Sequence, residues 1–174
     1  LQYLLDHADV RALVVDESLM DRVGEILDAL PQLEHVIINS PTGMELDSSH
    51  VASHQLSDLF RDMAPPMPQL STRSTSVILH TSGTTGPPKG VVLSHGAVLH
   101  LTRHIVWLMD YVPSDRLYTT FPLFHNNAKY TSVTAALECG GSLVMDKKFS
   151  ASGFWSTCRD KDVTAFNYMG GMLM

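Results

Sequence analysis

One stretch decides how this chain is interpreted: Leu79-His80-Thr81-Ser82-Gly83-Thr84-Thr85-Gly86-Pro87-Pro88-Lys89-Gly90-Val91-Val92-Leu93-Ser94. Apolar runs of strand type lie on both sides of its centre, at residues 76–79 and 90–93. The segment between them is rich in hydroxyls and glycines and carries Lys89. Glycine lets the backbone turn sharply and approach a ligand closely, because it has no Cβ. Backbone N–H groups, hydroxyls and an ammonium are donors that bind phosphate. The stretch therefore predicts a polyphosphate-binding loop between two strands.

Other phosphate loops have a different spacing. A Walker loop requires G-x-x-x-x-G-K-S/T running into a helix, whereas here Gly83, Gly86 and Lys89 are each separated by two residues and a strand follows. A dinucleotide-binding G-x-G-x-x-G is absent from the sequence. A surface turn stiffened by proline is the alternative without function, since such turns are common between strands.

The stretch resembles, almost letter for letter, the T-S-G-S/T-T-G-x-P-K-G signature of the adenylate-forming (AMP-binding) superfamily. This superfamily includes acyl-CoA synthetases, aryl-CoA ligases, peptide-synthetase adenylation domains and beetle luciferases. His80 departs from the pattern, because these enzymes commonly carry an aromatic residue such as tyrosine there. The resemblance implies that Lys89 supplies phosphate charge or braces the loop. It also implies that the preceding residues cradle the phosphates of ATP: Thr81, Ser82, Gly83, Thr84, Thr85 and Gly86.

A second motif follows a predicted strand over residues 116–121. Pro122-Leu123-Phe124-His125 places a histidine in the turn after that strand, and open α/β sheets bind ligands at the carboxyl ends of their strands. The chain has nine histidines, so this position alone does not establish a role. The segment also resembles the second adenylate-former motif, aromatic-P-L/M-F/Y-H. That resemblance implies that His125 orients the carboxylate and the α-phosphate, or gates the acyl channel.

Two departures from the common superfamily pattern indicate which branch of the superfamily the chain resembles. Asn127-Ala128 stands where many relatives carry glycine, and Tyr168-x-Gly170 stands where most have a V-P-x segment. Both resemble the carnitine/crotonobetaine CoA ligase and fatty-acid-transport-protein branch. The methionines beside Gly170 either line an acyl tunnel or pack in a core.

Strand and helix patterns alternate along the chain, which favours an α/β fold with doubly wound, mostly parallel sheets. In the helix expected from Ser94 to about Tyr111, the predicted buried stripe is Val98, Leu101, Ile105 and Leu108. Further helices are predicted at residues 2–8, 18–30 (capped by Ser18), 129–138 and after Ser150, and further strands at 12–15, 35–38, 142–145 and 163–167. Residues 39–75 show little periodicity apart from a short helix at 55–60. A break near residue 113 divides the chain into two α/β sub-domains, 1–112 with the phosphate loop and 113–174 on the acyl-pocket side.

Composition and charge narrow the function classes. A net charge of −6 without a lysine/arginine cluster argues against a nucleic-acid partner. No apolar run is long enough for a transmembrane helix, and the start lacks the pattern of a signal peptide. Cys139 and Cys158 do not have the spacing of zinc ligands. His100 and His104 lie one helical turn apart, but the sequence shows no third ligand for them. We therefore expect no metal site formed by the protein itself. We expect a cytoplasmic protein and, because both ends fall inside apparent elements, a piece of a longer one.

The resemblance implies an ATP-dependent acyl-CoA synthetase. In that family a carboxylate attacks the α-phosphorus of ATP to give acyl-adenylate and pyrophosphate, and CoA then takes the acyl group as a thioester. Mg²⁺ bridges phosphate oxygens. The expected partners are a small carboxylic acid, ATP and CoA. Later family elements, including the acidic magnesium residue and the C-terminal-domain lysine, are missing, so we expect the chain alone to be inactive. A peptide-synthetase-type adenylation domain, a luciferase-like enzyme and a non-catalytic nucleotide-binding module are the alternatives.

Overall fold

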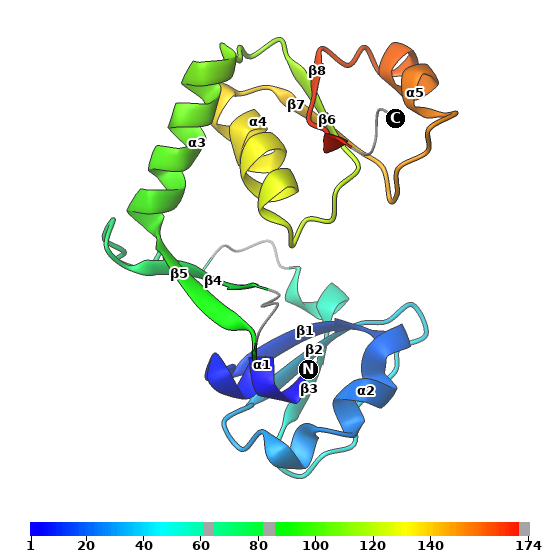
Figure 1. The fold of residues 1–174 in the computed structure, drawn as a ribbon. Helices are drawn as coiled ribbons and strands as arrows, with labels where there is room; N and C mark the ends of the chain where they lie inside the picture. Colours follow the sequence, from blue (N-terminus) through cyan, green and yellow to red (C-terminus); the bar gives the residue numbers. More distant parts are fainter. Residues whose placement is uncertain (61–64, 82–85, 171–174) are drawn as a thin grey trace. The chain divides into compact units, whose positions relative to one another are not determined.

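The computed structural model describes residues 1–60, 65–81 and 86–170. The chain forms two compact units (Figure 1), one comprising residues 1–69 and 78–92 and the other comprising residues 70–77 and 93–174. Within the described ranges, none of the helices has both the length and the apolar character needed to span a bilayer. The sub-domain boundary near residue 113 that the sequence predicts stays a prediction.

The first unit contains a parallel sheet in the order β1-β2-β3. Its register places Val14 beside Ile37 and Ile37 beside His54. Parallel pairing confirms the α/β class that the alternating pattern predicts. The strands are β1 (Ala12–Asp16), β2 (His35–Asn39) and β3 (Ala52–Gln55). The helical segments are α1 (Gln2–His7), η1 (Glu17–Leu19), α2 (Met20–Gly24), η2 (Leu27–Ala29) and η3 (Leu56–Leu59).

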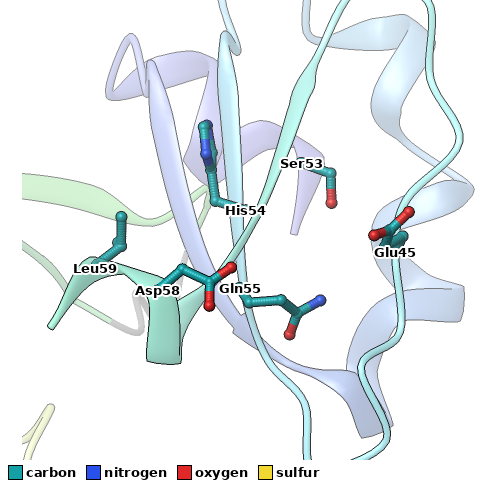
Figure 2. A pocket seen from close by; sticks show the side chains of 6 residues that line it. All are labelled: Glu45, Ser53, His54, Gln55, Asp58 and Leu59. Atoms are coloured by element: carbon teal, nitrogen blue, oxygen red, sulfur yellow. The ribbon is translucent and has the colours of Figure 1, made fainter.

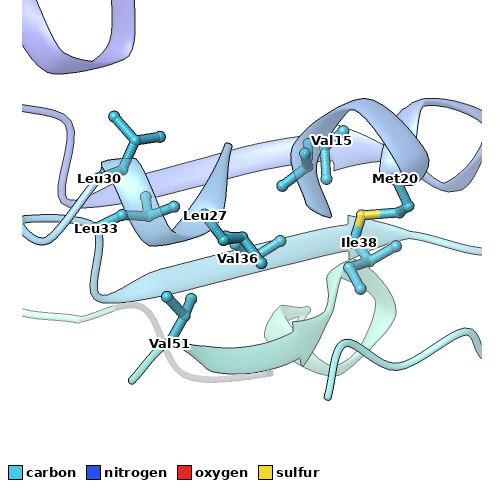
Figure 3. Packing of buried hydrophobic residues seen from close by; sticks show 9 residues of the cluster. Val15, Met20, Leu27, Leu30, Leu33, Val36, Ile38 and Val51 are labelled. Carbon is cyan, nitrogen blue, oxygen red and sulfur yellow. The ribbon is translucent and has the colours of Figure 1, made fainter. Parts of the chain in front are cut away.

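One face of this sheet carries the core of the first unit. Successive side chains of a strand point to opposite faces, so Val36 and Ile38 of β2 share a face, and both are 0% exposed. They pack with apolar residues from the segments around α2 (Figure 3), namely Met20, Val23, Leu27, Leu30 and Leu33, and with Val15 and Val51. Val14, on the opposite face, is 61% exposed. Among the described residues, the core of this unit therefore lies on the face that carries Val36 and Ile38.

Two local predictions for this unit are wrong. The single helix expected over residues 18–30 is broken into η1, α2 and η2. Ser18 is not its cap, because the carboxylate of Asp16 accepts from the Ser18 N–H at 3.1 Å and from the Ser18 hydroxyl at 2.7 Å. The strand β3 is also missing from the sequence prediction. Its polar sequence Ala-Ser-His-Gln lacks an apolar pattern, and its strand conformation comes from pairing with β2.

The loop-bearing strands are β4 (Thr75–Thr81) and β5 (Lys89–Ser94), which pair in a two-stranded sheet. β5 leads into α3 (His95–Met109). The hydroxyl of Ser94 accepts from the Ala97 N–H at 3.2 Å, which confirms the predicted N-cap of this helix.

The predicted buried stripe of α3 is partly wrong. Thr102 is its most buried residue, at 3% exposed, whereas Leu101 and Leu108 are 38% and 63% exposed. Thr102 shares a hydrogen bond of 2.7 Å with Thr134 in the neighbouring helix α4. The inward face of α3 therefore includes a hydroxyl pair and differs from the purely apolar stripe.

The second unit contains a parallel sheet in the order β7-β6-β8. Its strands are β6 (Arg116–Thr119), β7 (Ser142–Met145) and β8 (Ala165–Phe166). Besides α3 it has a π-helix, η4 (Asn127–Val133), and the helices α4 (Thr134–Cys139) and α5 (Phe154–Asp160). Leu117 of β6 packs with Ala135 and Ala136 of α4 in its core.

The helix predicted over residues 129–138 differs in one respect. It starts as the π-helix η4, whose wider turns change the angular position of every later side chain. Leu137, expected to point inward, is consequently 77% exposed, while Ala136 is buried. The predicted stop is confirmed, because Gly140 adopts a left-handed φ of 74° directly after α4.

Candidate functional site

The ends of the predicted phosphate loop lie beside each other in the first unit. Thr81 closes β4, Lys89 opens β5, and the Thr81 hydroxyl donates to the Lys89 carbonyl at 3.5 Å. Gly86 has a φ of 146°, and nothing lies within 4 Å of the position of a Cβ there. The requirement for glycine is therefore conformational and not steric. The predicted phosphate-binding residues Ser82, Gly83, Thr84 and Thr85 lie outside the described residues.

The helix α1 contacts residues on both sides of the loop. The Tyr3 hydroxyl donates to the Pro88 carbonyl at 3.3 Å. The ring of His7 lies edge-on to His80, with centroids 5.6 Å apart. A Cβ on Gly90 would lie 3.5 Å from His80 Nε2, so the ring lies next to this glycine at an ordinary contact distance. His80 therefore packs as a ring at the position where the superfamily commonly has an aromatic side chain.

His125 has a defined orientation in the second unit. Its backbone N–H donates to the Pro122 carbonyl at 2.9 Å, and its carbonyl accepts from the Lys129 N–H at 3.1 Å. Its ring nitrogen Nδ1 accepts from the backbone N–H of Asn127 at 3.2 Å. Because a backbone N–H can only donate, the neutral imidazole carries its proton on Nε2. His125 is exposed, so it offers an N–H donor at the surface.

The carboxyl edge of the β7-β6-β8 sheet gathers further polar groups. Asn167 directly follows β8, and its amide donates to the side-chain oxygen of Asn127 and, at 2.6 Å, to the hydroxyl of Thr131. Asp146, which directly follows β7, accepts from the Tyr118 hydroxyl at 2.6 Å. Burial, and then this hydrogen bond, raises the pKa of Tyr118 to about 12. His125 thus lies at an edge with a structured polar lining.

A separate cavity of about 240 Å³ opens in the first unit (Figure 2). Its lining comes from β3, η3 and the segment before them: Glu45, Ser53, His54, Gln55, Asp58 and Leu59. His54 Nε2 lies 3.1 Å from His35 Nδ1 in the neighbouring strand. None of the predicted site residues lines this cavity.

Metal-ligating side chains do not gather in the part of the chain that the structure describes, where no group of three could hold an ion. His100 and His104 stack on each other, with ring centroids 6.5 Å apart. Cys139 and Cys158 are both free thiols.

The predicted site residues fall into two sets. Thr81, Gly86 and Lys89 belong to the first unit, and the fold brings them to the two ends of one loop. His125 belongs to the second unit. Asn167 and Thr131 are not among the predicted site residues, because the predicted strand over residues 163–167 includes Asn167, whereas β8 ends at Phe166.

A parallel α/β fold with a glycine- and hydroxyl-rich loop and a histidine at a carboxyl sheet edge is typical of nucleotide-binding enzyme domains. The chain belongs to the AMP-binding enzyme family, whose sequence model matches residues 1–174. The superfamily membership expected from the loop signature is confirmed.

The relatives are acyl-CoA ligases and fatty acid transport proteins. Long-chain fatty acid transport protein 6 of Homo sapiens is 36% identical over 92% of this chain and 26% of its own length. The sulfoacetate–CoA ligase of Cupriavidus necator is 32% identical over 89% of this chain and 29% of its own. A solved structure of a Rhodopseudomonas palustris protein assigned as a long-chain-fatty-acid CoA ligase superposes with a TM-score of 0.83 at 22% identity, over 99% of this chain and 41% of that one. The chain spans 26% and 29% of these two curated relatives.

Proposed function

We propose that this chain is part of an ATP-dependent acyl-CoA synthetase. The enzyme would join a carboxylic acid to AMP with release of pyrophosphate, and would then transfer the acyl group to CoA. The observation that carries the proposal is the match of the AMP-binding enzyme family to the whole of residues 1–174. The loop signature, and relatives that include a CoA ligase and a fatty acid transport protein, support it.

In the first step a carboxylate oxygen bonds to the α-phosphorus of ATP, and the bond from that phosphorus to the oxygen bridging to the β-phosphate breaks. Negative charge builds up on the departing pyrophosphate. Donors that are already in place stabilise such charge most effectively. We assign this role to the loop from Thr81 to Gly86 and to the exposed ammonium of Lys89.

In this proposal His125 orients the carboxylate and the α-phosphate of ATP, or gates the acyl channel. Its Nε2–H is a donor because Nδ1 is occupied by the Asn127 N–H. A carboxylate or α-phosphate oxygen is a matching acceptor. Mg²⁺ would supply positive charge to the phosphates when it is bound with ATP.

The test is carboxylate-dependent exchange of pyrophosphate into ATP by the full-length enzyme. We expect Lys89→Ala to slow exchange by about 100-fold, the usual effect of removing one donor to a transition-state oxyanion. Lys161→Ala is the matched control, because Lys161 is equally an exposed lysine but follows α5 in the second unit. Unchanged exchange in Lys89→Ala would count decisively against the assigned role.

Three alternatives give different results. A peptide-synthetase-type adenylation domain would support exchange but would pass the acyl group to a carrier-protein thiol in place of CoA. A luciferase-like enzyme would emit light with a luciferin. A non-catalytic nucleotide-binding module would bind ATP or pyrophosphate in calorimetry without exchange. The cytoplasmic location expected from the sequence stays a prediction.

A further inference from the structure

We infer that Asn167 is a positioning residue for His125 and acts on it through Asn127. The place of Asn167 is fixed by the sheet, because the preceding residue, Phe166, pairs with Tyr118 of β6. His125 lies in the turn that follows the same strand β6. Two segments 40 residues apart in the chain therefore meet at one sheet edge, where the Asn167 amide reaches Asn127.

The contacts form a continuous chain of hydrogen bonds. The Asn167 amide donates to the side-chain oxygen of Asn127 and to the Thr131 hydroxyl, the latter at 2.6 Å. The Thr131 hydroxyl donates to the Asn127 carbonyl. The backbone N–H of Asn127 then donates to Nδ1 of His125 at 3.2 Å. Asn127 is thus held from two sides while its N–H points to the histidine.

The position of Asn127 at the start of η4 explains why its backbone N–H can donate to His125. The first N–H groups of a helix have no acceptor within the helix, so the N–H of Asn127 is available to the imidazole. The surroundings are tightly packed, since Ala128 is 0% exposed and Tyr130 is 3% exposed. An amide that loses its partner at such a place is costly, which favours a single arrangement of the two asparagines.

Together, Asn127 and Asn167 determine the tautomer of His125. As long as Nδ1 accepts from Asn127, the neutral ring must carry its proton on Nε2. If Asn127 moves, Nδ1 can take the proton, and the exposed side of the ring becomes an acceptor. An acceptor cannot bind the anionic oxygens of a carboxylate or phosphate, which are the ligands that the proposed function requires. The identity of the ligand that His125 binds rests on the proposed function. The tautomer of His125 does not rest on that function.

The first experiment measures the tautomer directly in the full-length protein. Two-bond ¹H–¹⁵N correlation spectra distinguish a protonated from an unprotonated ring nitrogen, and His125→Gln identifies the His125 signals. We expect Nδ1 to be unprotonated in the unmodified protein and Asn167→Ala to produce a mixture of tautomers. Asn39→Ala is the matched control, because Asn39 also ends a parallel strand and its amide donates to Asp16 at 3.1 Å. An unaltered tautomer in Asn167→Ala overturns the inference, whether or not the protein is an acyl-CoA synthetase.

The second experiment separates positioning from simple support of the fold. We expect Asn167→Ala to lower kcat for adenylate formation about tenfold, corresponding to about 1.4 kcal/mol of transition-state stabilisation, with KM for ATP little changed. In a His125→Ala background the same substitution should have almost no further effect. A full tenfold loss in that background would assign Asn167 a structural role only. If Asn167→Ala does not fold, Thr131→Val replaces it, since it keeps the side-chain shape and removes the hydroxyl that joins the two asparagines.

Discussion

Gly90 in β5 lies so close to Ile78 in β4 that a Cβ at position 90 would be 2.9 Å from Ile78 Cγ2. Carbon atoms in normal contact are about 3.5–4.0 Å apart, so an added methyl group has no room unless something moves. Cγ2 is attached directly to the β-branched Cβ of isoleucine and cannot rotate away freely. The two strands next to the loop therefore approach each other closely at this glycine.

We therefore predict that Gly90→Ala destabilises the protein by about 1–3 kcal/mol, the usual cost of forcing a methyl group into a packed site. The measurement is the free energy of unfolding in urea. Ile78→Leu removes the branch at Cβ and should recover a large part of the loss when combined with Gly90→Ala. Gly24→Ala is the control, because nothing lies within 4 Å of the position of its Cβ. Equal effects of Gly90→Ala with and without the Ile78→Leu substitution would contradict the steric explanation.

The hydrogen bond between Tyr118 and Asp146 leads to a prediction about alkaline stability. Burial and this bond raise the pKa of Tyr118 to about 12 in the folded protein, above the value of about 10 for an unfolded chain. A raised folded-state pKa means that the contribution to stability is complete below pH 10 and is lost as the pH rises through 12. Tyr118→Phe should remove this part of the decline between pH 10 and 12.

The measurement is urea unfolding at several alkaline pH values for the unmodified protein and for Tyr118→Phe. Tyr3→Phe provides the comparison, because the Tyr3 hydroxyl bonds to a carbonyl group, that of Pro88, and not to a carboxylate. If the unmodified protein and Tyr118→Phe lose stability with the same slope above pH 10, the tyrosine does not titrate as stated.

The sequence predicts those features that depend on neighbouring residues. Ser94 caps α3 as expected because its hydroxyl and the Ala97 N–H are three positions apart. Gly140 ends α4 as expected because glycine adopts the left-handed conformation there without a steric penalty. The roles predicted for the loop and for His125 rest on short motifs that resemble those of a known family.

The features that the sequence does not predict depend on contacts between residues that are far apart in the chain. Asn167 and Asn127 become partners only when β8 pairs beside β6, and neither residue alone indicates the other. β3 is polar and becomes a strand through its pairing with β2. The inward face of α3 was misplaced because the apolar stripe competes with a hydroxyl pair, Thr102 with Thr134, that a hydrophobicity pattern cannot include.

That hydroxyl pair gives the last prediction. Thr102 is 3% exposed, and its hydroxyl lies 2.7 Å from that of Thr134. The Thr134 hydroxyl also lies 3.3 Å from the Tyr130 carbonyl, so it retains an acceptor when Thr102 is changed. Thr102→Val should therefore cost about 1 kcal/mol, the net contribution of a typical hydrogen bond and not the larger penalty of an unsatisfied buried group.

The double-mutant cycle with Thr134→Val tests this account. Thr134→Val leaves the more buried Thr102 hydroxyl without its partner and should cost more, about 1–3 kcal/mol. The variant with both valines replaces the pair by apolar groups of the same shape, so its cost should be well below the sum of the two single losses. Thr72→Val, at an exposed threonine, serves as the control for the substitution itself. Strictly additive losses in urea unfolding would mean that the two hydroxyls contribute independently and that the contact does not fix the inward face of α3.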